Sequence, residues 1–294
     1  MLTQQSPRQE PIWITVIRLL RWDKPTGRLI LMIPALWAVV LAARGMPPLL
    51  LVGVIVLGTL ATSAAGCVVN DLWDRNIDPK VKRTRTRPLA SKALTVQTGI
   101  VVLLVAFACA YGLSLFLTPL SFWLCVAAVP VIVVYPLAKR VFPVPQLVLA
   151  IAWGFAVLIS WTAVTGALEW ATLWLWAATV LWTLGFDTVY AIADREDDRR
   201  IGVNSSALFF GDRTPQAVGI FFLLTTVFLG IEGNAMGLGI PYWVTLAIAF
   251  FGWITHYRQL LPRKPYPSVY GRIFRQNVYL GFILLAGMLL GFWL

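Results

Sequence analysis

Long runs of apolar residues alternate along the chain with short polar connections. A helix that crosses a bilayer needs about 20 mostly apolar residues. Nine segments come close to this length or exceed it: residues 27–44, 48–73, 95–117, 119–137, 145–166, 170–193, 215–233, 240–257 and 277–294. Pro130 and Pro136 interrupt the fourth segment, but membrane helices tolerate proline where neighbouring groups satisfy the freed carbonyls. The pattern predicts an all-α, multi-pass integral membrane protein with nine transmembrane helices.

The basic residues predict how these spans are oriented. Of the 24 Lys and Arg residues, all but Arg44 fall in five polar stretches: residues 1–28, 75–92, 137–143, 192–214 and 257–276. With nine spans and a cytoplasmic N-terminus, all five stretches lie on one side of the membrane. Loops rich in Lys and Arg mark the cytoplasmic side. We therefore expect an inner (plasma) membrane protein whose basic stretches face the cytoplasm.

The N-terminal stretch and the overall composition fit this topology. Residues 12–22 place apolar and basic side chains at helical spacing, which predicts a helix along the cytoplasmic interface. We expect residues 1–26 to form a cytoplasmic or interfacial segment of one membrane-embedded domain, residues 1–294. Hydrophobic residues make up 59% of the chain, and the net charge is +11. Topology and attraction to anionic lipid headgroups account for this charge, so we expect a lipid bilayer and no nucleic acid as partner.

Three aspartates end the second apolar segment. The stretch NDLWDRNID, residues 70–78, places Asp71, Asp74 and Asp78 at i, i+3 and i+7. If the helix continues to Pro79, these three carboxylates share one helical face. Seven basic residues follow between Arg75 and Lys92.

A second acidic cluster ends the sixth apolar segment. In FDTVYAIADREDDRRIG, residues 186–202, one helical face carries Asp187, Tyr190, Asp194, Asp197 and Asp198. The two clusters hold 8 of the 13 acidic residues, and both are cytoplasmic on the predicted topology. Asp187 lies inside the membrane boundary, where an ionised group is costly and usually faces a polar cavity at a functional site.

Clustered carboxylates suit Mg²⁺, which prefers oxygen ligands and commonly joins carboxylates to phosphate oxygens. Lys82, Arg83, Arg85 and Arg87 could neutralise the remaining phosphate charge. The two clusters therefore predict two halves of a diphosphate site. The alternative is a pair of solvated helix ends in which each aspartate forms an ion pair with a nearby arginine. It explains Asp198 and its neighbour Glu196, but it does not explain Asp187.

A third polar stretch, YPLAKRVFPVPQ at residues 135–146, places Tyr135, Lys139, Arg140 and Gln146 on the same side. A planar guanidinium can bind a carboxylate through two parallel hydrogen bonds, so Arg140 is a candidate for binding a carboxylated substrate. The alternative is that Lys139 and Arg140 serve only as a topology signal.

These stretches resemble the UbiA-type membrane prenyltransferase family. The first motif matches the family pattern N-D-x-x-D-x-x-x-D, and the second matches D-x-x-Y-A-x-x-D-x-x-D-D. Residues 21–37 (RWDKPTGRLILMIPALW), 87–89 (RPL), 135–140 (YPLAKR) and Asn277 are similar too, so the likeness covers nearly the whole chain. One departure is Asn204, which stands where many members have a lysine; this removes one candidate phosphate contact.

The resemblance implies nine helices around a central cavity and Mg²⁺-dependent transfer of a polyprenyl group from its diphosphate to an aromatic acceptor. Within the family, DKPTG and YPLAKR look most like the 4-hydroxybenzoate polyprenyltransferases. This implies prenylation of 4-hydroxybenzoate at C3, in the biosynthesis of ubiquinone or plastoquinone. Homogentisate, a dihydroxynaphthoate or a porphyrin remain alternative acceptors.

The motifs and the resemblance together imply a role for each candidate residue. The expected Mg²⁺ ligands are Asp71, Asp74, Asp78, Asp194 and Asp198. The expected diphosphate contacts are Asn70, Lys82, Arg83, Arg87 and Arg199. The expected catalytic residues are Asp187, Tyr190 and Asp194, with Tyr190 beside an allylic cation and Asp194 acting on the phenol or the ring proton. The expected acceptor contacts are Tyr135, Lys139 and Arg140.

Two other classes of membrane protein compete with this interpretation. A phosphatidyl transferase that acts on a CDP-alcohol also uses aspartates and Mg²⁺, but it needs D-x-x-D-G, and here Arg75 follows Asp74. A secondary transporter with a carboxylate ion site usually has repeats and broken helices at mid-membrane. The carboxylates here lie at one membrane edge. Prenyl transfer by purified protein without any gradient would separate an enzyme from a transporter.

Overall fold

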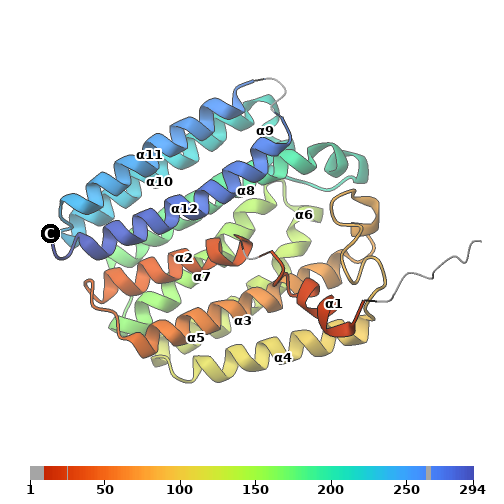
Figure 1. Cartoon of the computed structure of the whole chain (residues 1–294), viewed down its shortest axis with the longest axis horizontal. Helices are drawn as coiled ribbons and strands as arrows, with labels where there is room; N and C mark the ends of the chain where they lie inside the picture. The colour runs from red at the N-terminus through yellow and green to blue at the C-terminus, as the bar shows by residue number, and fades with distance from the viewer. Residues whose placement is uncertain (1–9, 25, 263–265) are drawn as a thin grey trace, which may run out of the picture.

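The computed structural model describes residues 10–24, 26–262 and 266–294, and in this part of the chain it contains helices and no strand. The helices run roughly side by side in one bundle (Figure 1). The α-helices are α1 (Ile12–Leu19), α2 (Thr26–Ala42), α3 (Leu49–Asp74), α4 (Val96–Ser114), α5 (Pro119–Val134), α6 (Ala138–Val141), α7 (Pro145–Thr165), α8 (Trp170–Ile201), α9 (Ser206–Phe210), α10 (Thr214–Met236), α11 (Ile240–Leu260) and α12 (Ser268–Leu290). Short 3₁₀ turns are η1 (Asp78–Lys80), η2 (Tyr135–Leu137) and η3 (Gly211–Arg213).

Each predicted apolar segment corresponds to one long helix of the described chain. Seven of these helices, some with a short flanking helix, are long and apolar enough to cross a membrane: α3, α4, α5 with α6, α7, α8, α9 with α10, and α12. The apolar helix α2 is shorter, with 17 residues. Helix α11 has 21 residues, but polar and aromatic side chains such as Tyr242, His256 and Tyr257 lower its hydropathy. The chain is an integral membrane protein, and nine spans with a cytoplasmic N-terminus stay a prediction.

The polar connections gather at one end of the bundle. Helices α1, α6 and α9 lie at this end, together with the chain between α3 and α4 (Figure 1). The C-terminus and the short turn after α2, which contains Arg44, lie at the opposite end. The basic stretches that the sequence predicts to share one side therefore lie at the same end of the molecule. Residues 1–9, 25 and 263–265 of those stretches lie outside the described residues.

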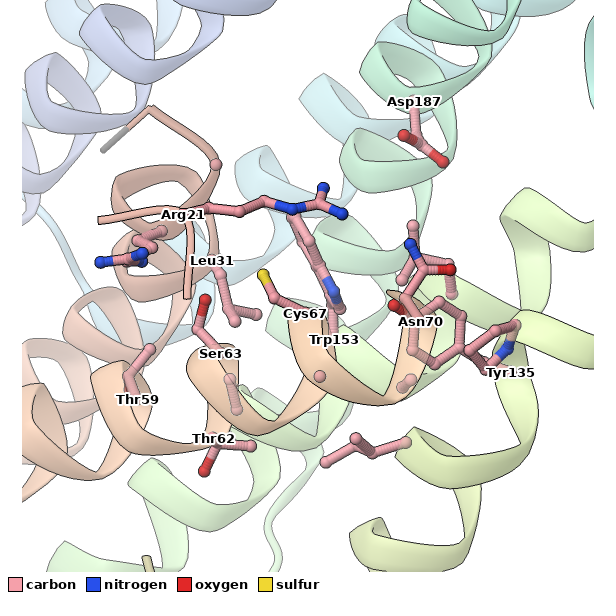
Figure 2. Close-up of a pocket in the computed structure, with 18 of the residues that line it drawn as sticks. Arg21, Leu31, Thr59, Thr62, Ser63, Cys67, Asn70, Tyr135, Trp153 and Asp187 are labelled. Carbon is pink, nitrogen blue, oxygen red and sulfur yellow. The ribbon is translucent and has the colours of Figure 1, made fainter. Parts of the chain in front are cut away.

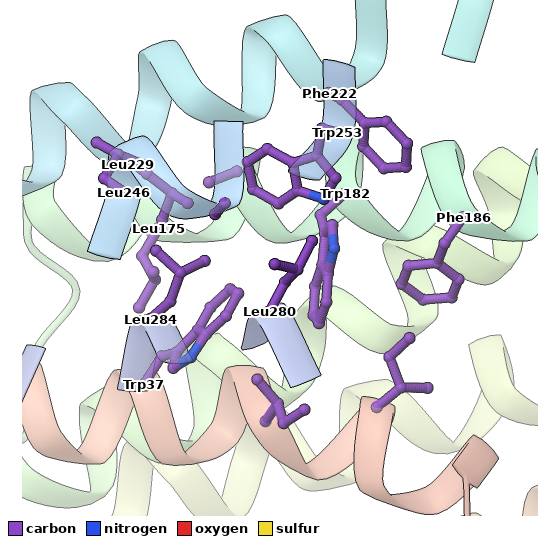
Figure 3. Packing of buried hydrophobic residues seen from close by; sticks show 14 of the residues in the cluster. Trp37, Leu175, Trp182, Phe186, Phe222, Leu229, Leu246, Trp253, Leu280 and Leu284 are labelled. Carbon is purple, nitrogen blue, oxygen red and sulfur yellow. The ribbon is translucent and has the colours of Figure 1, made fainter. Parts of the chain in front are cut away.

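The largest apolar core lies between α2, α8, α10, α11 and α12, and large aromatic side chains fill it (Figure 3). The rings of Trp37 and Trp182 lie 5.0 Å apart, and those of Phe222 and Trp253 stack at 5.5 Å. Buried indole N–H groups need hydrogen-bond partners, and Asn277 accepts one from Trp182 and another from Trp253, at 2.8 and 3.0 Å. Asn277 is therefore a packing residue that joins α12 to α8 and α11.

Helix α3 ends earlier than the sequence pattern suggested. It stops at Asp74, and Asp78 begins the separate turn η1. The helix does not continue to Pro79, because residues 75–77 form a turn and Pro79 lies inside η1. The three carboxylates of the first motif therefore do not share one helical face. Their placement depends on the turn and on the basic side chains described below.

Candidate active site

A cavity of about 1120 Å³ opens between the two acidic motifs. Helix α3 forms one wall with a row of lining residues that includes Thr59, Ser63, Cys67 and Asn70, and Asp187 faces the same space from α8 (Figure 2). The predicted site residues that line it are Asn70, Asp74, Asp78, Arg83, Arg87, Tyr135, Lys139, Asp187, Tyr190, Asp194 and Asp198. The fold thus brings together two motifs that are more than 100 residues apart in the sequence.

Two aspartates of the first motif are paired with arginines. Asp71 is fully buried, and it accepts a hydrogen bond of 2.7 Å from Arg21 Nη2. Arg87 Nη1 lies 2.9 Å from Asp78 Oδ2 and 3.3 Å from Asp71 Oδ1. A single guanidinium therefore holds Asp71 and Asp78 together across the end of α3, which the helical spacing alone would not achieve.

Asp74 is bound by the third polar stretch. Lys139, on α6, pairs with Asp74 Oδ2. Asp74 Oδ1 is buried without a hydrogen-bond partner in the described chain, and the nearest guanidinium, that of Arg140, lies 3.8 Å away. Arg140 donates instead to the carbonyl of Trp73 at 2.7 Å. Asp74 therefore keeps one carboxylate oxygen free to bind a ligand.

The second motif lies on one face of α8, as its spacing predicts. Arg83 reaches across from the chain after α3 and donates to Asp194 Oδ1 at 2.9 Å and to the Tyr190 hydroxyl at 2.9 Å. Its guanidinium also lies 4.7 Å from the centre of the Tyr190 ring, which is a cation–π contact. Gly202, with φ of 74°, ends α8 just beyond the motif in the left-handed conformation that glycine adopts readily. Arg83 thus links the two motifs directly.

The ion pairs change the acid–base properties of the two arginines outside the spans. Burial by itself lowers the pKa of Arg21, but the charge of Asp71, its hydrogen bond to Arg21 and smaller contributions from Cys67 and Tyr135 together raise this pKa above the ordinary value. Burial likewise lowers the pKa of Arg83, but the hydrogen bonds to Asp194 and the charges of Tyr190 and Asp194 together raise this pKa above the ordinary value. Both guanidinium groups therefore stay charged at any physiological pH.

Some expected site residues lie away from the cavity lining. Asp71, Lys82, Arg140 and Arg199 do not line it, and the last three are exposed. Asp71 instead holds Arg21 and Arg87 in position. Asn204, the departure from the family pattern noted above, lines the cavity. Its backbone N–H donates to the Lys139 carbonyl at 2.7 Å.

Arg21 is a site residue that the acidic motifs do not predict. It lines the cavity and pairs with Asp71, although 50 positions separate the two residues in the sequence. Arg275, on α12, also lines the cavity. The only sequence signal for Arg21 is its place at the start of the RWDKPTG stretch, and no spacing rule connects that stretch to the acidic clusters.

The aspartates offer the oxygen ligands that Mg²⁺ prefers. No three candidate ligands lie close enough together to hold a metal in the part of the chain that the structure describes. Carboxylate oxygens nevertheless face the same cavity from both motifs, and the buried Asp74 Oδ1 is without a partner. Hard oxygen donors of this kind fit Mg²⁺. The site residues are thus compatible with the ion that the sequence predicts.

Comparison with known proteins decides the family. The model of the UbiA prenyltransferase family matches residues 31–278, which is most of the chain. The chain belongs to the UbiA prenyltransferase family. It is 69% identical over 293 residues to a 4-hydroxybenzoate solanesyltransferase from Synechocystis sp., and the match covers 100% of both proteins. It is 39% identical over 283 residues to a 4-hydroxybenzoate octaprenyltransferase from Yersinia pseudotuberculosis, covering 96% of this chain and 97% of the relative.

Solved structures of UbiA homologues share the fold. The apo homologue from Aeropyrum pernix K1 superposes with a TM-score of 0.76 at 24% identity, over 90% of this chain and 98% of that one. The homologue from Archaeoglobus fulgidus bound to GPP and Mg²⁺ has a TM-score of 0.70 at 18% identity, over 92% and 99%. The family expected from the two acidic motifs is therefore confirmed, and this UbiA protein is a membrane prenyltransferase.

Proposed function

We propose that this enzyme transfers a polyprenyl group from its diphosphate to C3 of 4-hydroxybenzoate, with Mg²⁺ as cofactor, in quinone biosynthesis. The observation that carries the proposal is the cavity itself. Its charged end holds carboxylates and basic side chains from both motifs, and the rest of its lining is mostly apolar. A polyprenyl diphosphate has the same division between a charged head and an apolar tail. The 69% identity to a 4-hydroxybenzoate solanesyltransferase supports the choice of acceptor.

The diphosphate would bind among the basic residues at the charged end. Arg83 and Arg87 line the cavity, and each is paired with an aspartate of a motif. Mg²⁺, held by Asp74, Asp78, Asp194 and Asp198, would draw negative charge from the diphosphate as the carbon–oxygen bond breaks. Asp71 contributes by holding Arg21 and Arg87. Asn70 lines the cavity beside these groups, whereas Lys82 and Arg199 are exposed and do not line it.

The protein would then protect and direct the allylic cation. Tyr190 lines the cavity and already has a guanidinium beside its ring, so the same aromatic face can stabilise a cationic carbon. The phenol ring attacks this carbon from the position ortho to its hydroxyl, a carbon–carbon bond forms, and the ring proton must leave. We assign Asp194 to polarise the phenol or to accept that proton, and Asp187 to the polar wall opposite Arg21 (Figure 2).

The acceptor's carboxylate would bind near the third polar stretch. Tyr135 and Lys139 line the cavity, and Arg140 is exposed close to Asp74. A guanidinium binds a carboxylate in a planar, two-bonded geometry. We therefore assign acceptor recognition to Arg140, with Lys139 and Tyr135 shaping the site. Binding the carboxylate would require Arg140 to exchange its hydrogen bond to the Trp73 carbonyl for one to the acceptor.

We also propose nine spans in a single domain, residues 1–294, with the charged end of the cavity facing the cytoplasm. Helix α2 spans about 26 Å at 1.5 Å per residue, close to the roughly 30 Å hydrocarbon core. Helices α2 and α11 pack within the bundle in the same way as the seven more apolar helices. A site at the membrane edge would admit a soluble hydroxybenzoate and a lipid-soluble prenyl donor together.

An acceptor panel tests this function. The purified protein is given one polyprenyl diphosphate, Mg²⁺ and one acceptor at a time: 4-hydroxybenzoate, homogentisate, a dihydroxynaphthoate or a porphyrin. Mass spectrometry should detect prenylated 4-hydroxybenzoate as the main product. Faster prenylation of any of the other three would replace the proposed acceptor, and no transfer to any of them would remove the proposal.

A further inference from the structure

The cavity continues far beyond the charged site along α3. Its lining residues on this helix run from Asp74 back to Val54, a distance of 20 positions. At 1.5 Å per residue this corresponds to about 30 Å, which is about the thickness of a bilayer core. The lining at the far end includes Ile55 of α3, Leu113 of α4, Leu117 in the turn after α4, and Ile159 of α7. The Lys, Arg and Asp residues that line the cavity lie toward the end that holds the two motifs.

Two glycines of α3 make room for this inner part. Gly58 and Gly66 both line the cavity. A Cβ added at Gly58 would meet no atom within 4 Å, and one added at Gly66 would meet only Ile132, at 3.9 Å. A larger side chain at either position would therefore project into the cavity without a clash at its base. Along the helix, Gly66 lies about 12 Å and Gly58 about 24 Å from Asp74.

We propose that the prenyl chain lies along α3 toward the far side of the membrane, and that the cavity wall at Gly58 determines how long a chain the enzyme accepts. This inference rests on the proposed function, since it takes the charged end as the diphosphate site. An uncharged, apolar channel is the environment that an isoprenoid chain prefers over water. Gly58 lies in the deep part of the channel and leaves it open at a depth that only long chains reach. The Gly58 wall is thus a specificity element remote from the reacting atoms.

The test uses a series of donors and two blocking variants. Wild type, Gly66→Phe and Gly58→Phe are purified and assayed with 4-hydroxybenzoate, Mg²⁺ and geranyl, farnesyl, geranylgeranyl or solanesyl diphosphate. Gly58→Phe should lower kcat/KM for solanesyl diphosphate at least about tenfold, as expected for overpacking an occupied cavity, and leave geranyl diphosphate within about threefold of wild type. Gly66 lies nearer the charged site, so Gly66→Phe should lower kcat/KM already with shorter donors than Gly58→Phe does.

A matched control lies on the same helix. Gly53 also has open space at its Cβ position but does not line the cavity, so Gly53→Phe should behave as wild type with every donor. Gly58→Leu repeats the experiment with a smaller obstruction, and geranyl transfer reports that each variant is folded.

Equal use of solanesyl diphosphate by wild type and both Gly58 variants would overturn the inference, because the tail would then leave the site by another route. A parallel loss with short and long donors would overturn it as well. Failure of the proposed function would appear separately, as a wild type that prenylates no 4-hydroxybenzoate with any donor; the same donor series is then run with the acceptor that the panel selects.

Discussion

Each aspartate of the first motif is neutralised by a basic side chain from a different part of the chain. Asp71 pairs with Arg21 before α2, Asp78 with Arg87 after α3, and Asp74 with Lys139 on α6. Paired charges are tolerated at a buried site, whereas a single uncompensated charge is strongly destabilising. We infer that these basic residues balance the aspartates before substrate binds, and that Arg87 binds phosphate oxygens afterwards.

The free oxygen of Asp74 makes this residue the sharpest test of the metal-binding assignment. Asp74→Asn keeps the size of the side chain and removes its charge. We expect kcat to fall at least about a hundredfold, the size seen when a group that stabilises developing charge is removed, while the protein still inserts into the membrane. The exposed Asp212 provides the control, because Asp212→Asn should leave kcat unchanged. Activity of Asp74→Asn within about threefold of wild type would exclude Asp74 as a metal ligand.

Substitution of Arg140 tests whether this residue binds the acceptor or the diphosphate. Arg140→Ala should raise KM for 4-hydroxybenzoate roughly ten- to a hundredfold, since a charge-assisted hydrogen bond contributes about 1.5–3 kcal/mol. KM for the prenyl diphosphate should change much less. Arg140→Lys should restore only part of the loss, because an ammonium lacks the planar fork. Steady-state kinetics with each substrate varied in turn measures the split. A rise confined to the prenyl diphosphate would place Arg140 with the phosphate-binding residues.

At the level of elements, a single buried amide joins three helices. Asn277 of α12 accepts hydrogen bonds from Trp182 of α8 and Trp253 of α11. Asn277→Ala would leave two buried N–H donors without partners, and each such loss costs about 1–3 kcal/mol. We therefore expect a clearly lower Tm in detergent, measured by thermal unfolding. Asn234, which is exposed near the end of α10, gives the control Asn234→Ala. An unchanged Tm for Asn277→Ala would contradict the packing role.

The sequence predicts helices better than it predicts where they meet. The 3.6-residue period places Asp187, Tyr190 and Asp194 on one face correctly, because α8 continues straight through the motif. It misplaces Asp78, because the helix ends at Asp74. It does not find Arg21, because the contact with Asp71 joins residues that come together only through packing of the chain before α2 against α3. Periodicity describes one helix at a time, and the site depends on contacts between helices.

At the level of the whole molecule, the two ends of the bundle should face different compartments. Reporter cysteines at Arg213, near the basic end, and at Met46, near the opposite end, are introduced after Cys67, Cys109 and Cys125 have been replaced by alanine. In right-side-out vesicles a membrane-impermeant thiol reagent should label Met46→Cys and spare Arg213→Cys, because basic loops stay in the cytoplasm. Inverted vesicles should give the opposite pattern. Labelling of Arg213→Cys in right-side-out vesicles would reverse the proposed orientation.

Both acidic motifs, on this proposal, form one Mg²⁺-dependent diphosphate site at the charged end of the cavity. The most direct measurement is the initial rate of prenyl transfer to 4-hydroxybenzoate by purified wild-type protein, in Mg²⁺, after chelation with EDTA, and after Mg²⁺ is restored in excess. If the carboxylates hold Mg²⁺ for departure of the diphosphate, the protein should be fully active in Mg²⁺ and form no detectable product in EDTA. Its activity should return when Mg²⁺ is restored. Prenyl transfer that continues at the same rate in EDTA would contradict this account of the site.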